Sequence, residues 1–343
     1  MKNGVCLGHS VQEIVRIGYQ RAGYSPSERL LIAVSGGADS VALLHATLCC
    51  WPNDQTSFEV VHVNHGLRGL ESCADEEFVR NLANRERVAC HVLHITGNEL
   101  RAMPHRSLEE AARQKRYELL AGLAQTLGVR FVATAHHQDD QAETVLHNIL
   151  RGTGTRGLAG MKFARPLNNS LTLIRPALEL SRQQILRYVH EQSLSFREDS
   201  SNADADHTRN RIRNELLPCL RDTINPRVDQ NLINLAEQAS EITDLLDELA
   251  AAFLNHAVLE VQPEMVRLKR AECRCVQPVV LRHALVLLWV QLNWSRQRMT
   301  RRHWHVLAEA AAGQGTARGT LPRGVSFTAD RDVIRIHRVH EPR

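Results

Sequence analysis

Lysine, paired cysteines and long apolar runs are scarce in this 343-residue sequence. Only four of the 42 basic residues are lysines, so arginine carries nearly all of the positive charge. None of the eight cysteines forms a Cys-x-x-Cys pair, which argues against a zinc ribbon or a redox pair of that spacing. No apolar run is long enough to span a bilayer. The sequence therefore does not have the features of a membrane, zinc-ribbon or thiol-redox protein.

The first ten residues also lack the apolar core of a signal peptide. We therefore expect a cytoplasmic protein with reduced thiols and no membrane partner. The net charge of +4 says little about partners. Arginine, however, offers a planar fork that matches phosphate and stacks on bases.

The first two thirds of the chain alternate short apolar runs with stretches of helical period. Leu30–Val34 is a continuous apolar run, typical of a buried parallel strand. Such alternation predicts an α/β fold with a doubly wound parallel sheet, whose ligands bind beyond the carboxyl ends of the strands. The other expected strands are Glu59–Val63, Ala89–Ile95, Val129–Ala135 and Leu171–Ile174, and the expected helices are Val11–Arg21, Val41–Cys50, Ala74–Arg87, Ser107–Leu127, Gln141–Leu150 and one from the cap Ser181 to about Gln192.

Beyond about Ser195 the alternation stops. Phe196–Arg213 is polar and charged, and it is predicted to be a loop or linker. Asn231–Leu254 and Val279–Leu292 are expected helices, and Val325–Ile336 alternates as a hairpin does. We expect one domain over residues 1–217 and a second, mainly helical domain over residues 218–343 that ends in this hairpin.

A glycine turn, Ser35-Gly-Gly-Ala-Asp-Ser40, lies between the first strand and its helix. Gly36 and Gly37 allow a sharp turn whose N–H groups, with those of the helix N-terminus, would converge on an anion. Asp39 is an unusual neighbour for phosphate unless Mg²⁺ lies between them. No Gly-Lys-Ser/Thr follows, so this is not a Walker loop. A plain glycine turn with a helix cap is the alternative.

Two further groups of polar residues follow strands. His136 and Asp140 lie four residues apart, and we expect them to share a helix face, as Asp139 and Glu143 do. A His–carboxylate cluster at a strand end suits proton transfer or metal contact, although a solvated helix start is the alternative. After the second strand, Asn64 and His65 could face a nucleotide and Arg68 a phosphate, or the segment could be a simple turn.

The glycine turn resembles the PP-loop of the ATP pyrophosphatases. Together with seven other segments in the same order, it resembles the tRNA(Ile)-lysidine synthetase family, densely from Leu30 to Leu217. The other segments are His62–Arg68, Glu109–Arg113 with Arg116-Tyr117, Ala135–Thr144, Arg151–Gly160, Ile174–Pro176, Glu198–Asn202 and Thr208–Arg213.

The resemblance implies a PP-loop fold of the adenine nucleotide α-hydrolase type and an ATP-dependent ligase. ATP would adenylate carbon 2 of the wobble cytidine in a tRNA(Ile) with a CAU anticodon, and L-lysine would then displace AMP. The implied nucleotide-binding residues are Ser35, Gly36, Gly37, Ala38, Asp39, Ser40, Asn64 and His65. The implied catalytic residues are Asp39, which would hold Mg²⁺, with His136, Asp140 and Arg113.

Arginines outside the loop are the expected tRNA contacts. From Cys273 to Ala308 there is no acidic residue, and Trp294 and Trp304 flank the densest basic part. Cations beside aromatic rings suit phosphate contact and base stacking, although a solvated basic helix face fits equally well. The expected tRNA-binding residues are Arg209, Arg211, Arg213, Arg296, Arg298, Arg301 and Arg302.

The chain ends soon after the expected hairpin and so resembles the short form of the family. The oligomeric state stays open, with a homodimer among the alternatives. Another PP-loop enzyme, such as a tRNA thiolase, is the competing enzyme class, but those enzymes usually carry paired cysteines. A nucleotide-gated RNA binder without catalysis is the competing non-enzyme class.

Overall fold

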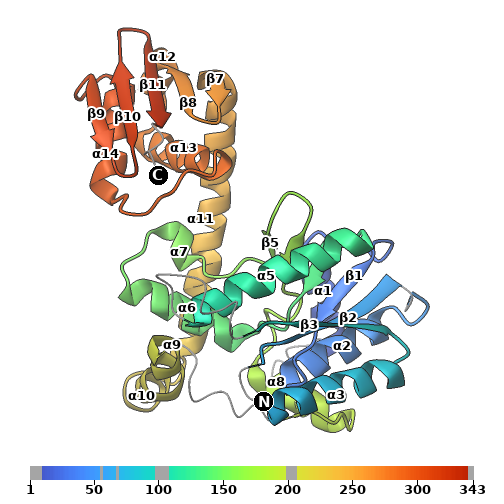
Figure 1. Cartoon of the computed structure of the whole chain (residues 1–343). Helices are drawn as coiled ribbons and strands as arrows, with labels where there is room; N and C mark the ends of the chain where they lie inside the picture. The colour runs from blue at the N-terminus through green and yellow to red at the C-terminus, as the bar shows by residue number, and fades with distance from the viewer. Residues whose placement is uncertain (1–9, 55–56, 67–68, 97–107, 198–206, 339–343) are drawn as a thin grey trace. The chain divides into compact units, whose positions relative to one another are not determined.

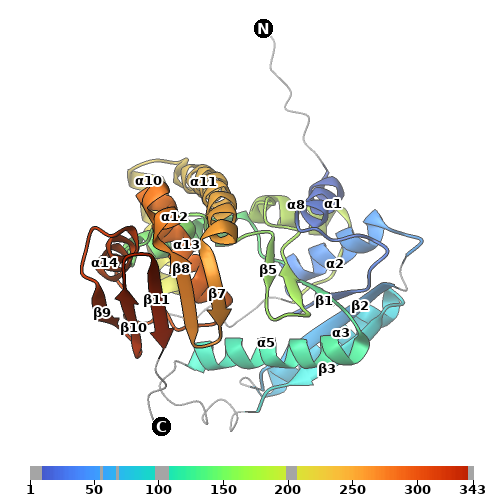
Figure 2. The ribbon, with the colours of Figure 1, turned by 90° about the horizontal axis from the view of Figure 1, so that it is seen from above.

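The computed structural model describes residues 10–54, 57–66, 69–96, 108–197 and 207–338. The chain forms two compact units, residues 1–238 and 239–343, which are described separately below. Figure 1 shows the course of the chain, and Figure 2 shows it turned by 90°.

The first unit is built on a six-stranded sheet with the order β3-β2-β1-β4-β6-β5. Five strands are parallel, as expected, but the edge strand β5 runs antiparallel to β6, so the sheet is mixed. The strands are β1 (Leu30–Ala33), β2 (Phe58–Asn64), β3 (Ala89–His94), β4 (Phe131–Ala133), β5 (Ala164–Pro166) and β6 (Thr172–Ile174).

Helices cover both faces of this sheet, which confirms the doubly wound arrangement. Alternate residues of β1 belong to different clusters: Leu30 and Ile32 pack with one helical layer, and Leu31 packs with the other. In Figure 1, α5 lies on one side of the strands and α2 and α8 lie on the other. The first layer contains α1 (Val11–Arg21), α2 (Ala38–Cys50), α3 (Leu70–Arg85) and α8 (Arg182–Glu191), and the second contains α5 (Leu108–Leu127).

The rest of the first unit is a helical cluster next to the sheet. The expectation of a loop up to Arg213 is wrong in part, because residues 207–216 are helical; residues 198–206 lie outside the described residues. Ile212 and Leu217 bury apolar surface against Val145 and so stabilise helical structure in a polar stretch. The elements are α6 (Gln138–Leu150), α7 (Thr155–Leu158), α9 (His207–Arg211), a π-helical turn (Ile212–Leu216), α10 (Leu217–Thr223) and the start of α11 (Val228–Ala257).

The second unit combines helices with a five-stranded antiparallel sheet in the order β7-β8-β11-β10-β9. The expected hairpin is confirmed as β10 (Val325–Ala329) and β11 (Val333–Arg338). The sequence reading missed three strands and two helices: β7 (Val258–Gln262), β8 (Met265–Lys269), β9 (Arg318–Leu321), α12 (Arg270–Cys275) and α14 (Arg301–Ala312). The apolar helix α13 (Pro278–Gln291) supplies much of the core, including Leu285 and Trp289.

Candidate active site

The glycine turn follows β1 at the carboxyl edge of the sheet and holds itself in shape by local hydrogen bonds. Gly36 has φ of 99°, a conformation that side chains with a Cβ rarely adopt, so the turn requires glycine here. Ser40 Oγ accepts from the N–H groups of Ser35 and Gly36, both at 3.2 Å, and donates to Gly37 O at 2.9 Å. The N–H of Arg197 donates to Gly36 O at 3.0 Å. Ser40 therefore stabilises the turn from within.

Helix α2 begins directly after this turn, at Ala38, and its N-cap Gly37 provides no capping side chain. The first N–H groups of an uncapped helix carry a partial positive charge and can donate to an anion. Ser35, predicted to contact phosphate, is exposed at the turn. The structure thus places the residues predicted for nucleotide binding from Ser35 to Ser40 together around one helix N-terminus.

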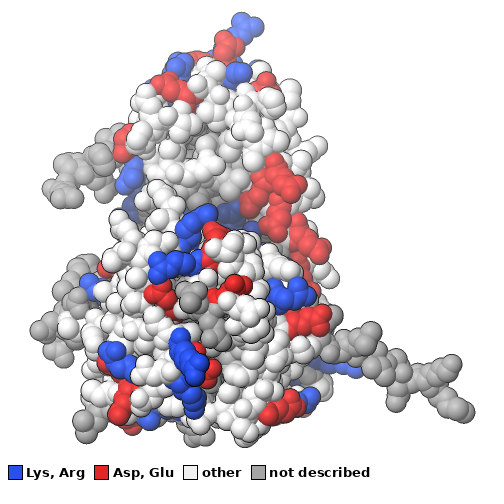
Figure 3. All heavy atoms as spheres, turned by 90° about the vertical axis from the view of Figure 1, so that its right-hand side faces the viewer, with Lys and Arg blue, Asp and Glu red and all other residues white. Residues whose placement is uncertain are grey.

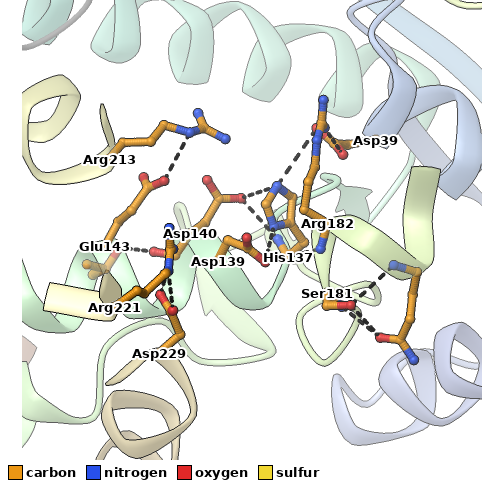
Figure 4. Close-up of polar contacts among 12 residues, drawn as sticks. Asp39, His137, Asp139, Asp140, Glu143, Ser181, Arg182, Arg213, Arg221 and Asp229 are labelled. Atoms are coloured by element: carbon orange, nitrogen blue, oxygen red, sulfur yellow. Dashed lines mark hydrogen bonds and ion pairs between the residues drawn. The ribbon is translucent and has the colours of Figure 1, made fainter. Parts of the chain in front are cut away.

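Asp39, in the first turn of α2, lies among side chains from two other helices. Figure 4 shows His137 between Asp39 and Arg182 on one side and Asp139 and Asp140 on the other. Arg182 Nη1 forms an ion pair with the buried Oδ1 of Asp39, although without hydrogen-bond geometry. His137 Nε2 lies 3.8 Å from Asp39 Oδ2. The carboxylate therefore already has two basic neighbours.

His137 is buried and serves as the N-cap of α6. Its Nδ1 lies 3.6 Å from Asp139 Oδ1, and its Nε2 lies 3.5 Å from Asp140 Oδ2. Burial by itself would lower the pKa of His137, but the contact with Asp139 and the charges of Asp140 and Asp39 outweigh it and raise the pKa. The carboxylates of Asp39, Asp139 and Asp140 thus favour the protonated form of His137, and these four residues form the His137 cluster.

Asp139 and Asp140 lie in the first turn of α6, where the helix dipole favours negative charge. Burial raises the pKa of Asp139, but the contact with His137 and a hydrogen bond from the Arg182 N–H, at 3.1 Å, lower it to about 2. Burial opposes the charge of Asp140 as well, yet His137 and His136 hold its pKa below the usual value. Both carboxylates are therefore ionised near neutral pH.

His136 precedes α6, which begins at Gln138. The expectation that His136 and Asp140 share a helix face is therefore wrong, because only Asp140 is helical. Thr134 Oγ1 lies 2.9 Å from His136 Nδ1. Burial lowers the pKa of His136 against the opposing charge of Asp140, and the charges of Arg175, Arg209 and Arg113 lower it further. His136 is therefore a neutral imidazole beside an ionised carboxylate.

Two of the arginines predicted to bind tRNA contact a buried carboxylate. Arg209 Nε lies 3.0 Å from Glu143 Oε2, and Arg213 Nε lies 3.2 Å from Glu143 Oε1. Arg209 Nη2 also lies 3.4 Å from Asp140 Oδ1. Only 2% of the Glu143 side chain is exposed, and this burial raises the pKa of Glu143 even though both arginines lower it. Arg211 points elsewhere and forms an exposed pair with Glu215 at 3.3 Å.

Asn64 and His65 lie at the end of β2, on the same edge of the sheet. The amide of Asn64 donates to Glu76 Oε2 at 3.0 Å, and its Oδ1 accepts from the Gly66 N–H at 2.9 Å. These bonds hold the turn after β2, so Asn64 has a structural role whatever else it contacts. Arg68 and the segment Glu198–Asn202 lie outside the described residues.

Arg113 lies on α5 and is exposed. Its Cζ is 5.4 Å from the centre of the Tyr117 ring. Its positive charge lowers the pKa of His136, although less than burial and the charges of Arg175 and Arg209 do. The charge of Arg113 therefore favours the neutral form of His136.

The predicted tRNA contacts of the second unit lie on the surface. Arg296, Arg298, Arg301 and Arg302 are exposed, and none forms an ion pair with another described residue. Arg301 and Arg302 occupy the first turn of α14, where positive charge opposes the helix dipole. The stability of α14 therefore does not explain why arginine occupies these two positions.

The suggestion that Trp294 offers its face to RNA bases is wrong, because Trp294 is only 4% exposed. Trp294 and Trp304 each pack edge-on against Trp289, with ring centres 5.0 Å apart. Both rings belong to the core of the second unit. In Figure 3, basic and acidic side chains lie in interspersed groups, so the face shown has no continuous basic surface.

Asp39 fits Mg²⁺ only in combination with phosphate oxygens. Within the described residues, no group of three or more His, Cys, Asp or Glu side chains could hold a metal ion. Mg²⁺ at nucleotide sites is typically bound by one or two carboxylates together with phosphates, which is what Asp39 at the glycine turn could offer. Among the described helices, none is both long and apolar enough to cross a membrane.

Sequence reasoning missed three buried or ion-paired side chains of this candidate site. His137 was overlooked beside His136, although its N-cap position brings it to Asp39. Arg182 follows the capping residue Ser181 at the start of α8, and nothing in the sequence around it indicates a contact with α2. Arg175 is a buried arginine just after β6, and the sequence marks it only through the Ile174–Pro176 segment. The position of Arg175 at a strand end was the available signal.

Comparison with known proteins agrees with this geometry. The family model described as a PP-loop domain matches residues 9–220. A tRNA(Ile)-lysidine synthase from Symbiobacterium thermophilum is 43% identical over 224 residues, which cover 65% of this chain and 46% of that protein. One from Geobacillus kaustophilus is 34% identical and covers 90% and 66% of the two chains. The chain thus spans about half to two thirds of the length of these relatives.

A third relative has a similar length. The tRNA(Ile)-lysidine synthase of a Synechococcus species is 32% identical over 326 residues, covering 94% of this chain and 95% of that protein. Among solved structures, the U34-tRNA thiolase NcsA from Methanococcus maripaludis matches with a TM-score of 0.56 at 15% identity, over 67% of this chain and 80% of that chain. This likeness concerns the fold alone. The chain belongs to the PP-loop proteins and, within them, to the tRNA(Ile)-lysidine synthase family.

Proposed function

We propose that the protein ligates L-lysine to carbon 2 of the wobble cytidine in a tRNA(Ile) with a CAU anticodon, at the expense of ATP. The observation that carries this proposal is the glycine turn beside the His137 cluster, at the carboxyl edge of one sheet. The turn suits a polyphosphate, and the cluster beside it supplies charged and neutral groups for proton transfer. The tRNA substrate would place the reaction in the cytoplasm.

ATP is proposed to bind with its β and γ phosphates at the turn. Gly37 and Ala38 would donate backbone N–H groups, and Ser35 its hydroxyl group. The Gly36 N–H and the Ser40 hydroxyl would join them by exchanging their bonds within the turn for bonds to phosphate. The uncapped start of α2 supports this arrangement. Asn64 and His65 would lie beside the nucleotide, at the end of the neighbouring strand.

Asp39 is the proposed Mg²⁺ ligand. Mg²⁺ held there would neutralise negative charge on the departing pyrophosphate. Since Arg182 pairs with Asp39, the arginine would have to release the carboxylate when the metal–nucleotide complex binds. Asp39 thus carries both the metal and the catalytic role in this proposal.

The first step would be attack by oxygen 2 of cytidine on the α phosphorus. An O–P bond forms, the bond to the β phosphate oxygen breaks, and pyrophosphate leaves. In the second step the ε-amine of lysine attacks carbon 2, and AMP departs with the former carbonyl oxygen. Lysine must first lose a proton, because its reference pKa is about 10.4.

His136 and Asp140 are the proposed groups that handle this proton. Because burial lowers its pKa, His136 is neutral near pH 7 and has a free electron pair to accept a proton. Asp140 stays ionised and can stabilise the imidazolium that forms. Arg113 would help to hold the negative charge of the reacting groups near them.

The tRNA is proposed to contact arginines in both parts of the chain. Arg296, Arg298, Arg301 and Arg302 are exposed and suited to phosphate. Arg209, Arg211 and Arg213 are proposed contacts as well, although two of them also hold Glu143. In this proposal residues 1–217 carry catalysis, residues 218–343 hold the tRNA, and a homodimer is allowed.

Labelled lysine tests the proposal. The protein is incubated with ATP, labelled lysine and tRNA(Ile) bearing CAU, and the tRNA is then digested to nucleosides. We expect the label in one modified cytidine, and none in a matched tRNA whose anticodon is changed to GAU. Label in both tRNAs, or in neither, would refute the proposed substrate.

A further inference from the structure

Arg175 is a buried arginine for which the described residues supply no carboxylate partner. It follows β6, and only 3% of it is exposed. Nη1 donates to the backbone oxygen of Lys162 at 2.7 Å, while Nε is buried without a hydrogen-bond partner. Buried charges are normally paired, because leaving water is costly for an ion. This guanidinium therefore lacks the anion that its burial calls for.

Two more arginines lie over the ring of Tyr117, and all three of these groups act electrostatically on Arg175. The Cζ atoms of Arg113 and Arg165 are 5.4 and 5.8 Å from the ring centre, and both side chains are exposed. Neither forms an ion pair with a described carboxylate. Two exposed arginines thus lie over one half-buried aromatic ring, and the charges of both act on Arg175.

The electrostatic effects point the same way. Burial, with the charges of Arg165 and Arg113, lowers the pKa of Arg175 to about 10 against the opposing effects of Tyr117 and Asp140. Like charges at this distance repel one another unless an anion lies between them. The grouping of these cations is therefore favourable only with an anion among them.

We propose that Arg113, Arg165 and Arg175 around Tyr117 form a binding site for a phosphate group. Guanidinium forks match phosphate oxygens two at a time, and an aromatic ring can support the guanidinium planes. This inference deepens the proposed function and rests on it for the source of the phosphate. That source is the RNA backbone beside the reacting base or a phosphate of the nucleotide.

The position of the site favours the RNA backbone. Arg175 follows β6 at the carboxyl edge of the sheet, where β4 leads into His136. Arg113 and Arg175 both act electrostatically on His136. A phosphate bound among them would therefore hold the RNA strand near the proposed base, and its negative charge would raise the pKa of His136.

The variant Arg165→Gln tests the site without disturbing the core, because Arg165 is exposed on an edge strand. The matched control is Arg130→Gln. Arg130 is also exposed and also lies over a ring, with Cζ 5.7 Å from the centre of Phe131, but it pairs with Glu28 at 2.9 Å and lies at the amino end of β4. Binding of tRNA(Ile) is measured by fluorescence anisotropy at several salt concentrations, and binding of ATP and pyrophosphate by calorimetry.

If the site binds a phosphate of the RNA, Arg165→Gln weakens tRNA binding about threefold to tenfold and reduces the slope of log affinity against log salt concentration by about one. ATP and pyrophosphate then bind as before. For a nucleotide phosphate, the affinity for ATP or pyrophosphate falls instead. Arg130→Gln changes neither. The phosphate site is refuted if Arg165→Gln leaves the affinities for tRNA, ATP and pyrophosphate unchanged. If the KM for lysine rises in that case, the anion bound at the site is a carboxylate.

Failure of the proposed function gives a different result. In that case the wild-type protein itself shows no tRNA binding above that of an unrelated RNA. The pyrophosphate measurement still tests the cluster, because Arg165→Gln must then weaken pyrophosphate binding for the phosphate site to stand.

Discussion

Arg182 on α8 forms an ion pair with Asp39 on α2, so a cation already occupies the carboxylate proposed to hold Mg²⁺. The same residue donates its backbone N–H to Asp139. Arg182 thus links the start of α8 to both the glycine turn and the His137 cluster. In the proposed reaction, Arg182 and the metal compete for one carboxylate.

Arg182→Gln should therefore lower the Mg²⁺ concentration needed for half-maximal pyrophosphate release. We expect a shift of about twofold to fivefold, the range that a partly exposed ion pair supports. Arg187→Gln, on an exposed position of the same helix, serves as control and should leave the requirement unchanged. A higher Mg²⁺ requirement in Arg182→Gln would contradict competition.

Arg209 and Arg211 lie on one short helix and should differ in their effect on stability. Arg209→Met leaves the buried Glu143 with Arg213 alone, which should lower the free energy of unfolding by about 2 kcal/mol. Arg211→Met removes an exposed pair and should cost less than about 0.5 kcal/mol.

Denaturant unfolding near pH 7 measures both changes. The deficit of Arg209→Met should shrink at acidic pH, because a protonated Glu143 no longer needs the arginine. Equal stability of the two variants, with equal loss of tRNA binding, would show that Arg209 serves RNA rather than Glu143.

The fold could be predicted further than the site. Leu30–Ala33 is apolar at every position because both faces of the sheet are covered, and that pattern is visible in sequence. The strands β7, β8 and β9 could not be predicted because charged or polar residues interrupt their apolar runs, as Glu260 does in β7, Arg267 in β8 and Arg318 in β9. An ion pair such as that between Arg182 and Asp39 depends on how distant segments pack together, and the local sequence pattern does not show this.

His137 should make stability depend on pH in a defined direction. Its pKa is raised in the folded protein, so its contribution is fully present below its unfolded pKa of about 6.5 and is lost as pH rises through the raised value. The stability difference between the wild type and His137→Asn should therefore be larger at about pH 6 than at about pH 9. Urea unfolding at the two pH values measures it, and a difference that is independent of pH would mean that His137 is neutral in the folded protein.

Arg301 and Arg302 should contribute to RNA binding without contributing to stability. Replacing both with glutamine should reduce the salt slope of tRNA binding by about two if each contacts one phosphate. The melting temperature should not fall, because the two cations oppose the dipole of α14. Arg267→Gln is the control, since Glu260 already neutralises Arg267 at 3.0 Å. An unchanged salt slope in the double variant would show that neither residue contacts the tRNA.

In the proposed reaction, the glycine turn holds the departing pyrophosphate while a tRNA base attacks the α phosphorus. The most direct test measures AMP, pyrophosphate and incorporated lysine when the protein is given ATP, lysine and tRNA(Ile) with the CAU anticodon. We expect equal amounts of the three products and essentially no AMP without tRNA. Formation of ADP and inorganic phosphate, or AMP release at the same rate without tRNA, would contradict it.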